Sequence, residues 1–116
     1  MIGGFEAMEM LTRLEELVLI SVLKLKSEAY GTAIFNHIVG LTGREATVSS
    51  VYFPLESLVR RGLLQAFQGE STPKRGGMGK RYYRLTKSGL AALEDSRALN
   101  LAAWRGVAVL MKQAEV

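Results

Sequence analysis

Positive charge is concentrated in one segment of this chain. Eight of its 15 lysine and arginine residues lie between positions 60 and 87, where Glu70 is the single acid. The segment is therefore far more basic than the net charge of +4 suggests. Clustered cations can neutralise phosphate groups, so the segment predicts contact with a nucleic acid. The eight bases are Arg60, Arg61, Lys74, Arg75, Lys80, Arg81, Arg84 and Lys87.

Hydroxyl groups precede these cations on a predicted helix that begins near Thr47 and ends at Gly62. Thr47 is a suitable N-cap, and Gly62 suits the left-handed position that follows a helix. The apolar residues at helical spacing face inward, which leaves a polar front able to reach the bases or phosphates of a DNA major groove. The residues that we expect to contact DNA are Thr47, Ser49, Ser50 and Tyr52 on this helix, and Lys74, Arg75, Lys80 and Arg81 beyond it.

Each of these groups also has a purely structural interpretation. Ser49 and Ser50 can be ordinary first-turn residues, and the basic segment can be a solvated loop. Tyr52 stands at helical spacing from apolar neighbours and can belong to the core. Arg60 and Arg61 lie at the end of the helix, where cations interact favourably with its dipole, and we expect that role for them rather than DNA contact.

The rest of the chain predicts the elements that position these residues. Thr12 and Glu15 have the T-x-x-E spacing of a capping box at the start of a helix. Pro54 stands inside the third helix and predicts a kink there. The pattern as a whole is mainly α with a small β-hairpin, a winged helix-turn-helix followed by a long C-terminal dimerisation helix. The expected elements are helices over residues 12–25, 31–39 and 47–62, strands over residues 63–67 and 81–85, and a last helix from Thr86 to about Lys112.

The last predicted helix, about 40 Å long at 1.5 Å per residue, carries an apolar stripe that a small domain cannot cover. The stripe includes Leu90, Leu93, Leu101, Trp104 and Ala108. We therefore expect a homodimer in which residues 87–116 form the dimerisation helix and residues 1–86 form a DNA-binding domain. The first helix is apolar on nearly every face, so we expect it at the dimer interface too.

Composition excludes several classes of function. Without cysteine the chain has no disulfide and no thiolate for catalysis or metal binding. His37 is the single histidine and has no co-ligand, so we expect it to be solvated or close to a phosphate. The neighbouring acids Glu15–Glu16 and Glu94–Asp95 do not face each other on a helix. We predict no enzyme activity, no cofactor and no metal. With no secretory signal and no apolar run long enough for a bilayer, we expect a cytoplasmic protein.

Four motifs occur in this order of elements: L-T-R-L-E-E-L-V-L-I-S-V-L, A-Y-G, V-Y-F-P-L-E-S-L-V-R-R-G-L-L and K-R-Y-Y-R-L-T-K-S-G. In this combination they resemble the PadR family of bacterial transcriptional regulators. Relatives often have proline directly after the helix tyrosine and glycine before it, as in G-T-L-Y-P, whereas here Phe53 precedes Pro54 and Ser49 takes the place of the glycine. The resemblance covers residues 11–111 and favours the compact branch, in which little follows a single C-terminal helix.

Residues and resemblance together predict a ligand-responsive, homodimeric repressor. Its paired third helices would enter successive major grooves of a palindromic operator, about 34 Å apart. The resemblance also implies that a small aromatic effector binds between the paired long helices, with Trp104 stacking on it and Asn100, Leu101 and Ala108 nearby. Ordinary packing in the dimer interface is the alternative for these four residues. Two other functions stay open: a winged-helix module that binds an acidic protein partner, and a DNA-compacting protein without sequence preference.

Overall fold

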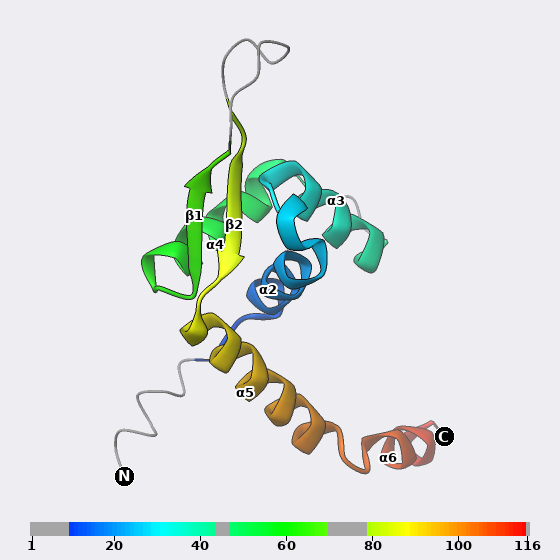
Figure 1. Ribbon diagram of the computed structural model, residues 1–116. Coiled ribbons are helices and arrows are strands. Elements are labelled where there is room, and N and C mark those ends of the chain that lie inside the picture. The colour runs from blue at the N-terminus through cyan, green and yellow to red at the C-terminus, as the bar shows by residue number, and fades with distance from the viewer. Residues whose placement is uncertain (1–9, 44–46, 70–78, 116) are drawn as a thin grey trace.

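The computed structural model describes residues 10–43, 47–69 and 79–115. In those parts the chain is mainly helical with a two-stranded hairpin, which confirms the predicted fold class (Figure 1). The elements in chain order are α2 (Arg13–Leu25), a 3₁₀ turn (Lys26–Glu28), α3 (Gly31–Thr42), α4 (Val48–Arg60), β1 (Leu64–Gln68), β2 (Arg81–Leu85), α5 (Lys87–Trp104) and α6 (Val107–Ala114).

Helices α2, α3 and α4 pack together around the core, and the hairpin adds a side chain to it. Leu19 from α2, Ile34 from α3, and Leu55 and Leu58 from α4 are fully buried. Tyr83 of β2 is the largest fully buried side chain among the described residues. Each of these side chains contributes about 1.5–3 kcal/mol of apolar burial, so the three-helix core holds α4 in a fixed orientation.

The ends of these helices follow the local sequence signals. The backbone N–H of Thr12 donates to Glu15 Oε1 at 2.9 Å, and the N–H of Glu15 donates to Thr12 Oγ1 at 3.1 Å, which is the predicted capping box. Gly43 (φ 64°) ends α3, three residues later than expected, and Gly62 (φ 75°) follows α4. A left-handed backbone conformation favours glycine at both of these ends.

Strand β2 is hydrogen-bonded both to β1 and to the residues just before α3. Strands β1 and β2 pair antiparallel with Leu64 opposite Leu85. On the other edge of β2, the N–H of Tyr83 donates to the carbonyl of Ala29 at 2.9 Å, and Tyr82 forms a bridge with Tyr30. Because β2 is hydrogen-bonded on both edges, the base of the hairpin and the helix-turn-helix form one unit.

The start of α5 is fixed to the turn that joins α4 to β1. Thr86 Oγ1 donates to the carbonyl of Gly62 at 2.6 Å, the Thr86 N–H donates to the carbonyl of Leu63 at 3.2 Å, and Thr86 Oγ1 also caps α5 by accepting from the N–H of Gly89 at 3.0 Å. A Cβ atom on Gly89 would overlap the carbonyl oxygen of Leu63 and lie 3.0 Å from its carbon. Only glycine allows this close approach.

The C-terminal segment corrects one prediction. The sequence predicts a single helix from Thr86 to about Lys112, but α5 ends at Trp104 and a separate helix, α6, begins at Val107. Gly106 has φ 77°, a left-handed conformation that breaks the helix between them. The apolar stripe continues in the sequence across this point, which conceals the break, although glycine disfavours helix by about 1 kcal/mol relative to alanine.

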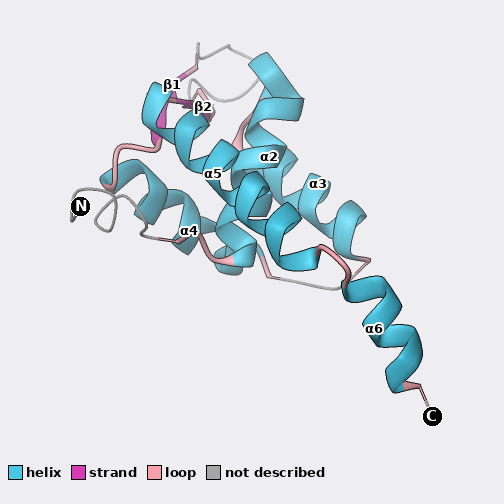
Figure 2. Ribbon diagram, turned by 90° about the horizontal axis from the view of Figure 1, so that it is seen from below, coloured by secondary structure: helices cyan, strands magenta, loops and turns pink. Residues whose placement is uncertain are grey.

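The two C-terminal helices extend from the rest of the protein. Helix α5 packs against α2, and α6 follows the end of α5 after a bend (Figures 1 and 2). Within the described ranges, no helix combines the length and the hydropathy that crossing a bilayer demands. The extended arrangement leaves much of the surface of α5 and α6 without cover from the same chain.

Candidate nucleic-acid interface

The first turn of α4 presents hydroxyl groups on the surface. Thr47 is the N-cap, as predicted, and its Oγ1 accepts from the N–H of Ser50 at 3.3 Å. Ser50 Oγ donates to the carbonyl of Thr47 at 2.6 Å, and Ser49 Oγ lies 3.1 Å from Thr47 Oγ1. All three residues are exposed. Because its proton is used locally, Ser50 offers the lone pairs of its oxygen to an approaching donor.

Tyr52 has both an exposed and a packed side. Its exposed fraction is 45%, yet its ring covers the first residue of α3: a Cβ atom on Gly31 would lie 3.0 Å from the Tyr52 hydroxyl oxygen. The small size of Gly31 therefore lets the ring lie across the junction of the two helices. Tyr52 therefore does not belong to the core, and its contact with DNA stays a prediction.

Aromatic rings support the cations at the base of the hairpin. Lys80 Nζ lies 3.7 Å from the centroid of the Tyr30 ring, and the guanidinium of Arg84 lies 5.0 Å from the Phe67 ring. Tyr82 joins the two rings, edge-on to Tyr30 at 5.6 Å and stacked on Phe67 at 5.8 Å. Cation–π contacts of this kind limit the motion of a long side chain while its charge stays accessible.

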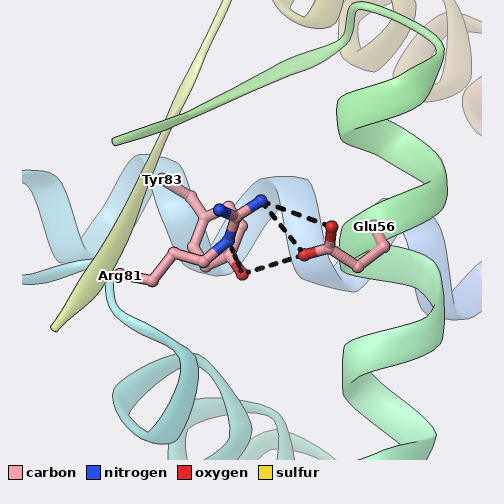
Figure 3. A network of polar contacts seen from close by, with 3 residues as sticks. All are labelled: Glu56, Arg81 and Tyr83. Carbon is pink, nitrogen blue, oxygen red and sulfur yellow. Dashed lines mark hydrogen bonds and ion pairs between the residues drawn. The ribbon is translucent and has the colours of Figure 1, made fainter. Parts of the chain in front are cut away.

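Arg81 is joined to the third helix by a network of hydrogen bonds (Figure 3). Its Nη2 donates to both carboxylate oxygens of Glu56 at 3.3 and 3.4 Å, and its Nε donates to the hydroxyl of Tyr83 at 3.2 Å. The Tyr83 hydroxyl donates in turn to Glu56 at 3.3 Å. Burial raises the pKa of Tyr83 above its ordinary value, so the hydroxyl keeps the proton that it donates.

This network changes the expectation for Arg81. The side chains of Arg81 and Glu56 are 48% and 44% exposed, so the pair lies at the surface between β2 and α4. In this structure Arg81 fixes the hairpin against the third helix, and its contact with DNA stays a prediction. Glu56 could not have been singled out from the sequence, because its partners lie 25 and 27 residues away.

The other predicted cations occupy different surroundings. Arg61, expected near the helix end, forms an ion pair with Glu15 of α2 at 2.8 Å, which ties α4 to α2. Arg60 lies exposed in the last turn of α4. Lys74 and Arg75 lie outside the described residues. His37 is partly buried: its Nδ1 lies 2.7 Å from Ser21 Oγ, in a contact between α3 and α2, and its closeness to a phosphate stays a prediction.

The residues predicted for an effector or dimer interface are divided between α5 and α6. Asn100 Nδ2 donates to the buried carboxylate of Glu16 at 2.8 Å, beside Ser96, whose hydroxyl donates to the same oxygen at 2.7 Å. These bonds fix α5 against α2. Leu101 is 57% exposed and Trp104 is 59% exposed, whereas Ala108 follows the break and lies on α6.

A groove of about 710 Å³ lies between α2 and α5. Ile20 and Leu23 of α2 and Leu93 of α5 give it apolar walls, and Asn100 and Leu101 line it as well. Trp104 and Ala108 lie outside its lining, so the groove gathers two of the four residues predicted for an effector. Among the described residues, no group of three or more histidine, cysteine or acidic side chains could hold a metal ion.

Comparisons with known proteins agree with this arrangement. Residues 19–95 match the model of the transcriptional regulator PadR-like family. A PadR-like transcriptional regulator from Bacillus cereus is similar in structure, with a TM-score of 0.64 and 20% identity over 97% of this chain and 93% of that chain. A PadR family regulator from Eggerthella lenta has a TM-score of 0.64 and 26% identity over 82% and 80% of the two chains. One from Clostridium difficile has a TM-score of 0.59 and 22% identity over 88% and 97%. No curated protein matches the sequence significantly.

Proposed function

The chain belongs to the PadR-like family of transcriptional regulators, and from this premise we propose that it is a ligand-responsive, homodimeric repressor of a palindromic operator. Family membership makes it a DNA-binding regulator of transcription rather than an enzyme. Beyond family membership, we propose the oligomeric state, the surfaces that contact DNA and the ligand that changes the affinity for DNA.

The proposal rests on exposed hydroxyls at the start of α4 and on cations of the hairpin that stay accessible to solvent. Thr47, Ser49 and Ser50 are exposed at the start of α4. Lys80, just before β2, and Arg84, on β2, lie against the rings of Tyr30 and Phe67. A helix can enter the major groove with its N-terminal residues at the bases, while a basic hairpin lies along the neighbouring phosphates. The ion pair between Arg81 and Glu56 supports a fixed angle between these two contacts.

Uncovered apolar surface supports the dimer. Leu90, Leu101 and Trp104 on α5 are each more than half exposed, and so are Leu110 and Met111 on α6. Soluble monomers rarely expose apolar patches of more than a few hundred Å². A second copy that pairs through α5 and α6 would cover these side chains and place two α4 helices on one face, as a palindrome requires.

The groove between α2 and α5 supports the response to a ligand. Its volume of about 710 Å³ falls within the range of small-molecule sites. Because it adjoins the proposed dimer surface, an effector bound there would favour one arrangement of the two copies over another. A change in that arrangement alters the spacing of the two α4 helices and hence the affinity for the operator.

A competition assay tests the proposal directly. The purified protein is titrated onto DNA from upstream of its own gene, in the presence of scrambled competitor at physiological salt, and its mass in solution is measured in parallel. We expect a dimer that prefers its own DNA by about a thousandfold or more. Equal affinity for both DNAs would favour a compacting protein, and binding to neither would favour a protein-interaction module.

Two lysine variants identify the surface that contacts DNA. Lys80→Ala removes a cation of the proposed interface, and Lys112→Ala removes one from α6. Lys80→Ala should weaken binding to all sequences and reduce the slope of log K against log salt by about 0.9 for each phosphate that the variant no longer neutralises. Lys112→Ala should leave the slope unchanged. If the two variants behave alike, the hairpin does not contact the DNA backbone.

A further inference from the structure

Phe53 has an unusual position for a large apolar residue. Its exposed fraction of 77% is the highest among the exposed large hydrophobic side chains of the described residues. By contrast, Val51 and Leu55, two positions away on the inner side of α4, are 2% and 0% exposed. An apolar ring of this size costs about 1.5–3 kcal/mol when it stays in water rather than in an apolar environment. The fold itself does not explain the phenylalanine at this position.

The surroundings of Phe53 are the polar face of α4. Residues three, four or seven positions apart lie on the same side of a helix, so Phe53 shares its side with Ser49 one turn earlier and Arg60 two turns later. Both of these neighbours are exposed. The ring is therefore an exposed apolar group among polar residues, which also include Ser50, Ser57 and the half-exposed Glu56 that holds Arg81.

The occupant of this surface is a polyanion rather than another copy of the chain. Two copies that met through this face would bring the Arg60 residues together on a protein of net charge +4. The apolar surfaces suited to a second copy lie instead on α5 and α6, and the groove is lined by α2 and α5. Arg60, exposed on the same side of α4 as Phe53, offers a positive charge to phosphates, and Arg81 of β2 is held against this helix by Glu56.

The DNA major groove offers one apolar group at the edges of its bases. That group is the 5-methyl of thymine, and phenylalanine is among the side chains that pack against it. We propose that Phe53 recognises thymine by packing on its 5-methyl group, and that it determines the sequence preference of α4 at that position. The inference rests on the proposed function, since it requires α4 to enter the major groove.

The serines and the phenylalanine would then have different roles. Ser49 and Ser50 have hydroxyls that can bond to several base edges or to phosphate, so they discriminate weakly. Phe53 has no hydrogen-bonding group and would be placed well only against an apolar partner. A single contact of this kind selects thymine against cytosine, whose edge carries a polar amino group and no methyl.

Deoxyuridine substitution in the operator tests the proposal. Uracil pairs as thymine does and lacks only the methyl group. The preferred site is first found by selection from random DNA, and each thymine is then replaced in turn, in both half-sites together. At one thymine position we expect affinity to fall about fourfold for each methyl group, or about 15-fold for the two half-sites, from the free energy of burying one methylene-sized group.

Two protein variants complete the experiment. Phe53→Ser should bind the thymine and uracil operators equally at that position, because the partner of the methyl group is gone. Leu41→Ser removes another exposed apolar side chain, 48% exposed near the end of α3, and should keep the full preference for thymine. Since Phe53 is exposed, thermal unfolding of the Phe53→Ser variant should match that of the wild type.

The outcomes separate this proposal from the proposed function. Disappearance of the methyl effect in Phe53→Ser alone supports the contact. Specific binding by the wild type without any uracil penalty overturns the contact and leaves the regulator intact. The same penalty in wild type and Phe53→Ser also overturns it, because the methyl group then acts through another residue or through DNA shape. No specific binding by the wild type overturns both proposals.

Discussion

The contact between Gly89 and Leu63 predicts a large effect from the smallest substitution in the chain. In Gly89→Ala the added Cβ would overlap the Leu63 carbonyl oxygen. Overpacking in well-packed sites costs about 1–3 kcal/mol, and here the obstacle is backbone, which cannot change rotamer. Relief requires α5 to move from the turn, which stretches the bonds from Thr86 to Gly62 and Leu63. Alanine favours a helix over glycine by about 1 kcal/mol, which offsets part of this cost.

We therefore expect Gly89→Ala to lower the free energy of unfolding by about 2 kcal/mol, the upper end of the overpacking cost less the gain in helix propensity, equivalent to about 8 °C in Tm for a chain of this size. Gly40→Ala is the matched control, because Gly40 is also helical and exposed and its Cβ would meet nothing within 4 Å. This control should gain up to about 1 kcal/mol from helix propensity.

Denaturant unfolding followed by circular dichroism measures both variants, at one fixed protein concentration because association adds to apparent stability. Opposite signs for the two substitutions support the described position of α5. A Gly89→Ala protein at least as stable as the wild type would refute it, since α5 would then lie far enough from Leu63 to accept a methyl group.

Two further substitutions test the interface and the proposed dimer. Glu56→Gln removes the charge that holds Arg81 and should free its guanidinium to bind a phosphate. We expect tighter binding to scrambled DNA, and a slope of log K against log salt that is steeper by about 0.9 per protomer. An unchanged slope would mean that Arg81 is remote from the DNA. In Trp104→Ala, sedimentation should show a dimer dissociation constant raised about 30-fold or more, as expected when an interface residue contributes about 2 kcal/mol. An unchanged dissociation constant would exclude Trp104 from the interface.

Local signals in the sequence predicted the local parts of the fold. The caps Thr12, Thr47 and Thr86 act through residues two or three positions away, so their roles can be recognised without knowing the tertiary structure. Gly62 was recognisable for the same reason. Gly106 carried a similar signal for a helix end. The apolar stripe that continues past it favoured one continuous helix, and the glycine predicted the backbone better than the stripe did.

Contacts between distant residues could not be predicted in the same way. Arg61 meets Glu15 across 46 positions, and Asn100 meets Glu16 across 84. Which acid meets which base depends on how far each helix is rotated, a quantity that composition and periodicity do not fix. The sequence therefore indicated that cations gather near α4 and the hairpin, but it did not show that Arg81 is held by a carboxylate.

Helix α6 has a consequence for how the chain folds at different concentrations. It has eight residues, none of them buried, and Leu110 is 63% exposed. A helix this short is marginal in water on its own. If a second copy covers its apolar side, folding of α6 is coupled to association and therefore depends on protein concentration. Dilution should melt residues 107–114 first, so the helix content of this protein should itself depend on its concentration.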